Sequence, residues 1–272
     1  RKIAFAGCTV YSLAPYRLLC TYLRCSVGEY TAMLFLPLVL YGLYRIYEET
    51  DKKVKWLPLA IGFSGLIQCH VISTLLATIF TALFCLARLK ETFQWKNFKQ
   101  LLIAVFAVII IDFWFLVPFL DYFRFDYYST ELTALGNTNA QGTYPVKLFT
   151  LFPRGAGDAY SVAKGVGVTG EMSYPLGAAF GVVGVCYLFY LLSRKDIKKK
   201  DKIIKIGNCA LIGGCIATFM ACVWFPWDFI QEMFNGKFAM IVQNIQFPWR
   251  MLGIATLLFS VVFMCLIVKL IE

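Results

Sequence analysis

The sequence has few charged residues and only one histidine, and each shortage excludes a class of protein or site. Asp, Glu, Lys and Arg make up 15% of the 272 residues, whereas about a quarter of a soluble domain is charged. His70 is the single histidine, and no two cysteines form a CxxC pair. A histidine-rich zinc site is therefore excluded, and the low charge argues against a soluble globular domain.

Hydrophobic residues take the place of the missing charge. They make up 60% of the chain, aromatic residues make up 17%, and the mean hydropathy is +0.69. The apolar residues gather in blocks of about 20, a length that matches the hydrocarbon core of a bilayer. The pattern predicts an all-α, polytopic transmembrane helix bundle of about seven to eight spans, which forms a single membrane domain over residues 1–272.

Eight apolar blocks are the predicted spans, and the first of them is short. Two short neighbouring blocks meet at Gln68–Cys69–His70, which leaves a tight helical hairpin and one broken helix as alternatives. The chain begins at Arg1 without a methionine, so we expect a fragment of a longer protein. The predicted blocks are Ile3–Leu13, Glu29–Tyr47, Trp56–Cys69, Val71–Leu86, Leu101–Leu120, Tyr174–Leu192, Ile203–Trp224 and Met251–Ile271.

Basic residues alternate in density from one connecting segment to the next, and this sets the predicted topology. The segments that are short and dense in Lys and Arg are expected in the cytoplasm, and they are about 48–55, 88–100 and 193–202. The segments expected on the non-cytoplasmic side are about 14–28, 121–173 and 225–250. Most of the net charge of +10 lies in the short loops. No basic stripe is interleaved with aromatic residues, so nucleic-acid binding is not expected.

Most of the ten cysteines fall inside apolar blocks, where free cysteine behaves as a small hydrophobic residue. Cys85 and Cys265 are examples. Cys20 and Cys25 instead lie near a predicted outer segment, which leaves a disulfide between them open.

Two arginines before the second predicted span form the first candidate site. Arg17 and Arg24 are seven residues apart, so they share one face of an α-helix. Tyr22 lies between them, and Glu29 opens the following span near its positive dipole end. Two guanidinium groups at the membrane surface suit a phosphate or pyrophosphate, because their planar forks pair bidentately with oxyanions. The alternative is that they anchor a juxtamembrane helix to lipid headgroups.

The run Gln246–Phe247–Pro248–Trp249–Arg250 leads into the last predicted span and forms the second candidate, with Gln243 just before it. Trp249 stands where an interfacial aromatic anchor is expected. Arg250 stands at a helix N-terminus, where its charge opposes the helix dipole and calls for an anionic partner. Snorkelling of Arg250 to lipid headgroups is the alternative.

Two further polar residues stand in or beside predicted spans. Asp112 lies inside the apolar run Val108–Leu116, and an acid within the membrane is a functional candidate by default. Capping of a neighbouring helix, or a pair with an arginine, is the alternative for Asp112. His70 follows the third block and could act as an acid or base, or contact a phosphate. A lone histidine is more often structural.

One glycine-rich segment, Gly165–Gly170, spells GxGxxG. No strand precedes it and no βαβ unit surrounds it, so it predicts a flexible loop and not a dinucleotide site.

No acidic residue stands out as a general base. The acidic residues on the predicted outer side are Asp121, Asp126, Glu131, Asp158, Glu171, Asp228 and Glu232.

Two groups of residues resemble motifs of a bacterial membrane protein family. They are Tyr16–Leu19 with Tyr22, Arg24, Gly28–Glu29 and Leu36–Leu38, and Gln246–Arg250. The chain resembles, along most of its length, the YfhO-like or 6-pyruvoyl-tetrahydropterin synthase-related integral membrane proteins of the GT-C glycosyltransferase superfold. Pterin chemistry is not implied, because soluble enzymes of that name bind zinc through histidines.

The resemblance implies transfer of a sugar from a polyprenyl-phosphate-linked donor to a cell-envelope acceptor, on the outer face of the plasma membrane. GT-C enzymes keep a catalytic Asp or Glu in the first external loop, which would lie upstream of Arg1, so no catalytic residue is assigned. A divalent cation as cofactor, the sugar, the acceptor and the oligomeric state are left open. The residues expected to bind the lipid phosphate or sugar are Arg17, Tyr22, Arg24, Glu29, His70, Gln246, Trp249 and Arg250.

Two other functions stay open from the sequence. A transporter or flippase of a lipid-linked or anionic substrate would place polar residues on broken helices, which Asp112, as an intramembrane polar site, and the Gln68–His70 junction favour. No internal repeat supports it. A non-catalytic scaffold for envelope polysaccharide assembly is the third alternative. The expected partners are membrane lipids and a lipid-linked sugar.

Overall fold

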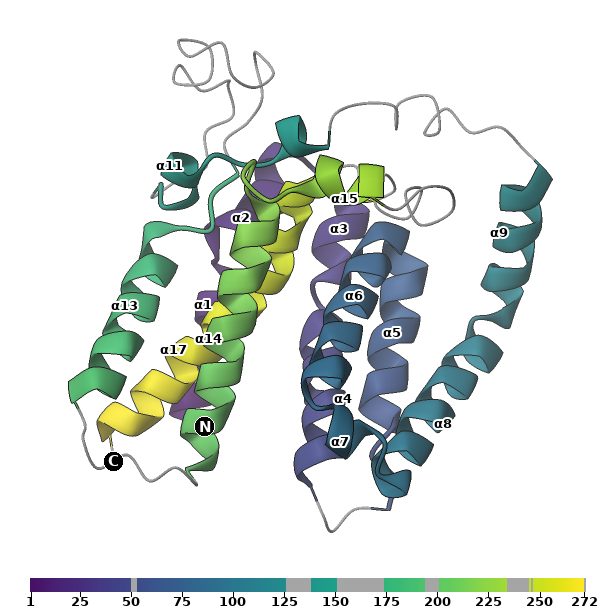
Figure 1. Ribbon diagram of the computed structural model, residues 1–272, viewed down its shortest axis with the longest axis horizontal. Helices are drawn as coiled ribbons and strands as arrows, with labels where there is room; N and C mark the ends of the chain where they lie inside the picture. The colour runs from purple at the N-terminus through teal and green to yellow at the C-terminus, as the bar shows by residue number, and fades with distance from the viewer. Residues whose placement is uncertain are drawn as a thin grey trace. The chain divides into compact units, whose positions relative to one another are not determined.

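The computed structural model describes residues 1–49, 53–125, 138–150, 174–193, 201–233, 245 and 247–271. Across these residues the regular secondary structure is helical, apart from one isolated bridge between Thr143 and Cys222. Figure 1 shows the helices. The predicted all-α class is confirmed for this part of the chain.

Three helices in the described part are long and apolar enough to cross a membrane, namely Val27–Glu48, Lys202–Ala221 and Pro248–Ile271. Two bent pairs raise the number to as many as five if each pair is one span. The bent pairs are Lys2–Ser12 with Pro15–Leu23, and Trp95–Ile111 with Phe113–Tyr122. Such helices are those of a membrane protein. A total of seven or eight spans stays a prediction.

The chain forms two compact units, which are described separately. Unit 1 comprises Arg1–Cys25 and Gly136–Glu272, and unit 2 comprises Ser26–Leu135. In unit 1 the structure describes α1 (Lys2–Ser12), α2 (Pro15–Leu18), the π-helix η1 (Leu19–Leu23), η2 (Asn139–Gln141), α11 (Pro145–Leu148), α13 (Ala178–Ser193), α14 (Lys202–Ala221), α15 (Trp227–Met233), η3 (Pro248–Met251) and α17 (Leu252–Ile271). In unit 2 it describes α3 (Val27–Ala32), α4 (Leu36–Glu48), α5 (Leu57–Cys69), α6 (Val71–Ala87), α7 (Leu89–Thr92), α8 (Trp95–Ile111) and α9 (Phe113–Phe125). A single membrane domain over residues 1–272 stays a prediction.

Helix α17 forms the core of unit 1, because it is apolar on every side and most of its residues from Leu252 to Leu266 are buried. It packs against α14, α13 and α1, and Figure 1 shows α17 in yellow among them. A Cβ at Gly214 of α14 would lie 3.0 Å from the ring of Phe259, and one at Gly7 of α1 would overlap the side chain of Met264. Small residues at helix contacts allow this close approach.

Helices α4 and α5 of unit 2 also pack through glycines. A Cβ at Gly42 would lie 2.5 Å from the backbone nitrogen of Leu59, and one at Gly62 would lie 2.8 Å from that of Val39. Helices α5 and α6 form a tight hairpin that turns at His70, whose backbone is extended (φ −162°, ψ 105°). The hairpin is one of the two alternatives that the sequence leaves open.

Two predicted segments differ from the structure. The single span predicted over Leu101–Leu120 is broken at Asp112, where α8 and α9 meet at a bend of 74°. The polar connector predicted over residues 14–28 is largely helical, with α2 and η1 along Pro15–Leu23. Both differences arise where a break or a change of helix type interrupts a pattern that periodicity alone treats as uniform.

Helix boundaries in unit 1 also shift. Helix α13 begins at Ala178 rather than at the predicted Tyr174. Gly177 just before it has φ 109°, a left-handed conformation that favours glycine and that an α-helix does not contain. Helix α14 ends at Ala221 rather than at the predicted Trp224.

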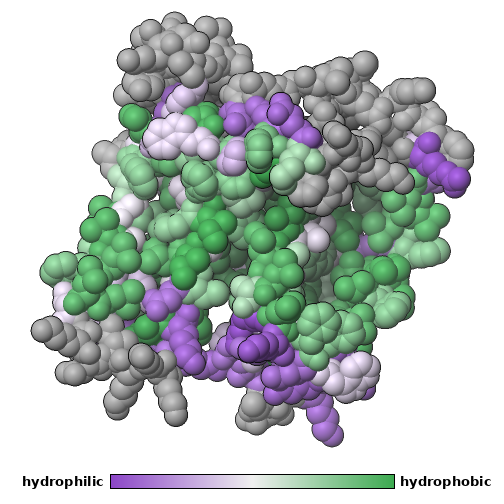
Figure 2. Space-filling model, viewed as in Figure 1, coloured by the Kyte–Doolittle hydropathy of each residue, from purple (hydrophilic) through white to green (hydrophobic). Residues whose placement is uncertain are grey.

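Exposed side chains on the helices are largely hydrophobic. Phe5 is 76% exposed, Ile110 is 74% exposed and Leu192 is 83% exposed. Figure 2 shows hydrophobic residues covering the helices, while hydrophilic residues gather near helix ends. Soluble monomers rarely expose apolar patches of this extent, so these surfaces suit contact with lipid.

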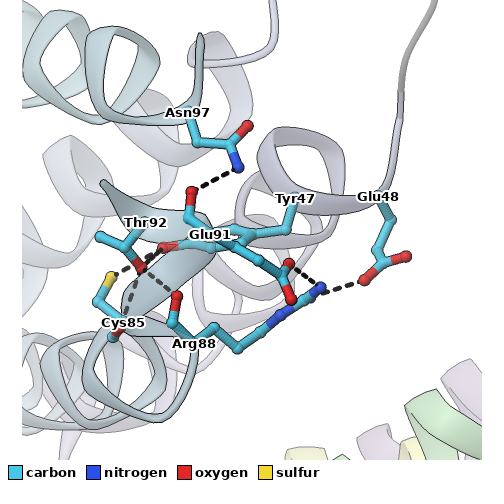
Figure 3. A network of polar contacts seen from close by, with 7 residues as sticks. All are labelled: Tyr47, Glu48, Cys85, Arg88, Glu91, Thr92 and Asn97. Carbon is cyan, nitrogen blue, oxygen red and sulfur yellow. Dashed lines mark hydrogen bonds and ion pairs between the residues drawn. The ribbon is translucent and has the colours of Figure 1, made fainter. Parts of the chain in front are cut away.

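Arg88 joins α4, α6 and α7 at one end of unit 2 (Figure 3). Its guanidinium group donates to the carboxylate of Glu48 at 2.6 Å and to that of Glu91. The hydroxyls of Tyr47 and Thr92 lie 2.6 Å apart in the same network. Burial lowers the pKa of Arg88, but its hydrogen bonds to the two carboxylates outweigh burial and raise the pKa above the ordinary value. The basic segment about residues 88–100 therefore begins with an arginine that holds the fold together.

Asp201 caps α14 and joins it to α17 in unit 1. Its Oδ1 accepts from the N–H groups of Ile203 at 2.9 Å and Ile204 at 3.3 Å, and its Oδ2 lies 2.7 Å from Nζ of Lys269. The hydrogen bond with Lys269 is the main cause that lowers the pKa of Asp201, and the two N–H groups add to it.

We expect Asp201→Asn to lower the stability of the fold by up to about 1 kcal/mol at neutral pH, because asparagine keeps the cap but loses the ion pair. The folded-state pKa of Asp201 is lowered, so its stabilisation is present above the unfolded value of about 3.9 and is lost as the pH falls through the folded value. Thermal unfolding of the purified protein from about pH 8 to pH 3 measures the difference. A difference that grows on acidification would contradict the assignment, and the exposed Asp121→Asn is the control.

Candidate functional site

One end of unit 1 holds a group of rings and guanidinium groups that we call the aromatic cluster: Arg24, Tyr174, Phe247, Trp249 and Arg250. Trp249 is 3% exposed. Its ring stacks on Tyr174 with centroids 4.0 Å apart and planes at 4°, and on Phe247 at 5.2 Å and 23°. Cζ of Arg24 lies 4.1 Å from the Trp249 ring centroid and 5.9 Å from that of Tyr174. Cζ of Arg250 lies 5.0 Å from the Phe247 centroid and 5.5 Å from that of Trp249.

Three segments meet in the aromatic cluster because each leaves regular α-helix there. Pro248 begins the 3-10 helix η3 ahead of α17. Arg24 stands at the C-terminal end of the π-helix η1. Tyr174 lies just before Gly177, whose N–H donates to the carbonyl of Leu148 at 2.8 Å. The cluster thus lies at the N-terminal end of α17, which carries Lys269 toward its other end.

The aromatic cluster offers donors to an anion. A cation over an aromatic ring is stabilised by about 0.5–2 kcal/mol, which favours a charged guanidinium in this place. Nε1 of Trp249 is buried and has no hydrogen-bond partner among the described residues. Leaving a buried donor unpaired costs about 1–3 kcal/mol, and a bound group with an acceptor oxygen would remove that cost.

Arg17 and Tyr22 lie apart from these rings. Cζ of Arg17 lies 5.3 Å from the ring centroid of Tyr11 in α1, and Tyr22 is 75% exposed. The wider turn of η1 shifts the register between Arg17 and Arg24 by about one residue, or about 100°. The shared α-helical face predicted for the two arginines is therefore a wrong prediction.

Three candidates belong to unit 2. Glu29 is 3% exposed in α3. His70 caps α6, because its Nδ1 accepts from the N–H of Ser73 at 3.2 Å. Asp112 is fully buried, and its Oδ1 accepts from Nε2 of Gln68 at 2.7 Å. Convergence of Glu29 and His70 with the arginines of unit 1 stays a prediction.

The acidic candidates take different positions. Asp121 in α9 and Glu232 in α15 are exposed. Oδ1 of Asp228 accepts from the N–H groups of Thr138 at 2.9 Å and Asn139 at 3.2 Å, so this carboxylate holds η2 in place. The candidates that lie outside the described residues are Asp126, Glu131, Asp158, Glu171, Gln243, Gln246 and the GxGxxG segment Gly165–Gly170.

Neither a metal cluster nor a disulfide is present in the described part of the chain. No group of three or more His, Cys, Asp or Glu side chains there could hold a metal ion. All ten cysteines are described, and all are free. The disulfide left open between Cys20 and Cys25 is not formed, and Nη1 of Arg24 instead lies 3.6 Å from Sγ of Cys20.

Sequence reasoning missed two residues of unit 1. Tyr174 was expected at the start of a span, but it stacks on Trp249. Lys147 in α11 is 6% exposed, and its Nζ lies 5.5 Å from the ring centroid of Tyr144. An aromatic residue directly before Pro175 and Gly177 is a signal of a segment that ends before a helix. No comparable signal marks Lys147.

Comparison with protein-family models, with curated proteins and with solved structures finds no match to this chain. The resemblance to YfhO-like proteins therefore rests on the sequence motifs alone.

We expect Trp249→Leu to destabilise unit 1 by about 2–4 kcal/mol, because it removes the stack on Tyr174 and the contact with Arg24. Trp249→Phe should cost less than half as much, since it keeps a ring and removes an N–H that has no partner. Thermal and denaturant unfolding of the purified variants measures both. Equal losses in the two variants would show that stacking does not hold the cluster together.

Proposed function

We propose that this protein is a GT-C-like membrane glycosyltransferase. It takes a sugar from a polyprenyl-phosphate-linked donor and passes it to a cell-envelope acceptor on the outer face of the plasma membrane. The aromatic cluster is the observation that carries the proposal. When the sugar–phosphate bond breaks, negative charge develops on the departing polyprenyl phosphate, and Arg24 and Arg250 would stabilise that charge.

Several features favour a lipid-linked phosphate over a soluble one. Tryptophan and tyrosine are enriched where a membrane helix meets the interface, and Trp249 and Tyr174 stack beside the start of α17. Guanidinium forks match phosphate oxygens bidentately. The apolar surfaces of the helices suit a prenyl chain, whose burial is favoured by about 0.8 kcal/mol for each methylene group.

A general base is also needed to activate the acceptor hydroxyl. Among the described acids of unit 1, Asp201 and Asp228 cap helices and Glu232 is exposed. No catalytic acid is assigned, so binding of the polyprenyl-phosphate donor tests the proposal more directly than substitution of a general base.

The topology is part of the proposal, with seven to eight spans and the aromatic cluster on the non-cytoplasmic side. We expect an epitope tag inserted after Ala140 to bind antibody on intact spheroplasts, and one inserted after Lys198 to bind only after permeabilisation, because the basic segment stays inside. Full-length tagged chains are used. Labelling of both tags in the same compartment would overturn the topology and the donor site with it.

We expect the purified protein to bind undecaprenyl phosphate in nanodiscs, and Arg24→Ala to weaken binding by roughly 10- to 100-fold, as the loss of one charge-assisted hydrogen bond implies. Arg24→Lys should give an intermediate affinity, because it keeps the charge and loses the fork. Tryptophan fluorescence titration measures binding.

Lys205→Ala is the matched control, since Lys205 is exposed on α14 toward the end opposite the cluster. Undecaprenol, which lacks the phosphate, is the control ligand. Equal affinities of the Arg24→Ala and Lys205→Ala variants for undecaprenyl phosphate would count against the proposal. Equal affinities of the wild type for undecaprenol and undecaprenyl phosphate would do the same.

A transporter or flippase of a lipid-linked or anionic substrate is the second candidate, and the buried Asp112 at the α8–α9 break favours it. A flippase would move a fluorescent lipid-linked sugar between the leaflets of proteoliposomes without releasing the sugar. A transferase would release polyprenyl phosphate.

A further inference from the structure

Asp112 of unit 2 stands at a break in an otherwise apolar helix. Helix α8 ends at Ile111 and α9 begins at Phe113, with a bend of 74° between them. Asp112 is 0% exposed. Its Oδ1 accepts from Nε2 of Gln68 at 2.7 Å, and its Oδ2 is buried with no hydrogen-bond partner among the described residues.

Neither of the structural roles expected for an acid in this position is filled by Asp112. It forms no ion pair with an arginine or lysine in the described part of the chain, and no N–H group of α9 donates to its carboxylate. Only the backbone of Asp112 takes part in the junction, because its carbonyl accepts from Phe115 at 2.9 Å and Leu116 at 2.8 Å. The buried carboxylate is therefore neither a helix cap nor half of a salt bridge.

The break also places the carboxylate beside the end of a helix. Helix α8 ends at Ile111, directly before Asp112. The carbonyl of Val108 accepts from the N–H of Asp112 at 2.9 Å. The C-terminal end of α8 carries partial negative charge from its dipole, and this charge adds to that of the carboxylate.

Several elements around the break carry other ionisable groups. Helices α5 and α4 pack against α8. The nearest lysine on α8 itself, Lys99, lies about 20 Å along the helix from Asp112. The remaining ionisable groups on these elements and on the neighbouring α3 are Glu29, Tyr30, Tyr41, Tyr44, Arg45, Tyr47, Glu48, Cys69, His70, Lys96, Asp121, Tyr122 and Arg124.

We propose that Asp112 and Gln68 at the α8–α9 break form a site for one monovalent metal cation, Na⁺. A buried carboxylate needs a compensating positive charge in a medium of low dielectric constant. Carbonyls at broken helices and the C-terminal ends of half-helices are the groups that bind such cations in membrane proteins. A single carboxylate suits a monovalent cation, and no cluster of three metal-ligating side chains lies in the described residues.

The test measures thermal unfolding of the full chain in detergent at constant ionic strength, with NaCl exchanged for choline chloride at pH 8. Na⁺ raises the unfolding temperature of the wild type by about 2–4 °C in a saturable manner. Asp112→Asn, which keeps the shape and the bond from Gln68, shows no response. Gln68→Leu keeps the carboxylate and needs more Na⁺ for the same rise.

A matched control removes a carboxylate outside the site. Asp121→Asn, exposed on α9, should respond to Na⁺ as the wild type does. Equal responses of the wild type and Asp112→Asn to Na⁺, including no response at all, would overturn the proposal. The result does not depend on the transferase, because no lipid donor is present.

Discussion

Backbone polar groups inside a bilayer have to be bonded within helices, and this constraint decides where the chain can place chemistry. The described chain leaves regular α-helix at His70, Asp112, Gly177 and Phe247. His70 caps the following helix itself, and Gly177 donates its N–H to the Leu148 carbonyl. Each break therefore contains polar groups or backbone conformations that an uninterrupted membrane-spanning helix excludes. The aromatic cluster and the Asp112 site both lie at such breaks.

The sequence predicts the helical class and most helix positions, because long apolar blocks depend only on composition. It fails where one side chain changes the path of the chain. Asp112 was identified as an unusual residue, but the bend of 74° was not, since the apolar run continues on both sides. The register of Arg17 and Arg24 was missed because a π-helix has no signature in the spacing of apolar residues. The stack of Tyr174 on Trp249 joins segments far apart in sequence, which periodicity cannot reveal.

The arginines of the aromatic cluster lie over rings rather than in the carboxylate network that holds Arg88. The difference matters chemically. A guanidinium paired with two carboxylates has most of its donors committed, and its charge is compensated within the fold. A guanidinium stacked on Trp249 instead lies against an aromatic face, which stabilises its charge. Arg88 therefore supports structure, while the proposal for an external anion rests on the position of Arg24 over the Trp249 ring.

The two proposed sites have opposite electrostatic character. The aromatic cluster in unit 1 places guanidinium groups over aromatic rings, whereas the α8–α9 break in unit 2 holds a buried carboxylate. In a low-dielectric surrounding, an excess of either sign is relieved most cheaply by a ligand of the other sign. The cation proposed for the α8–α9 break follows from this rule, while the phosphate proposed for the aromatic cluster rests on the guanidinium groups over its rings. Because each site is built within its own unit, the loss of one leaves the physical argument for the other intact.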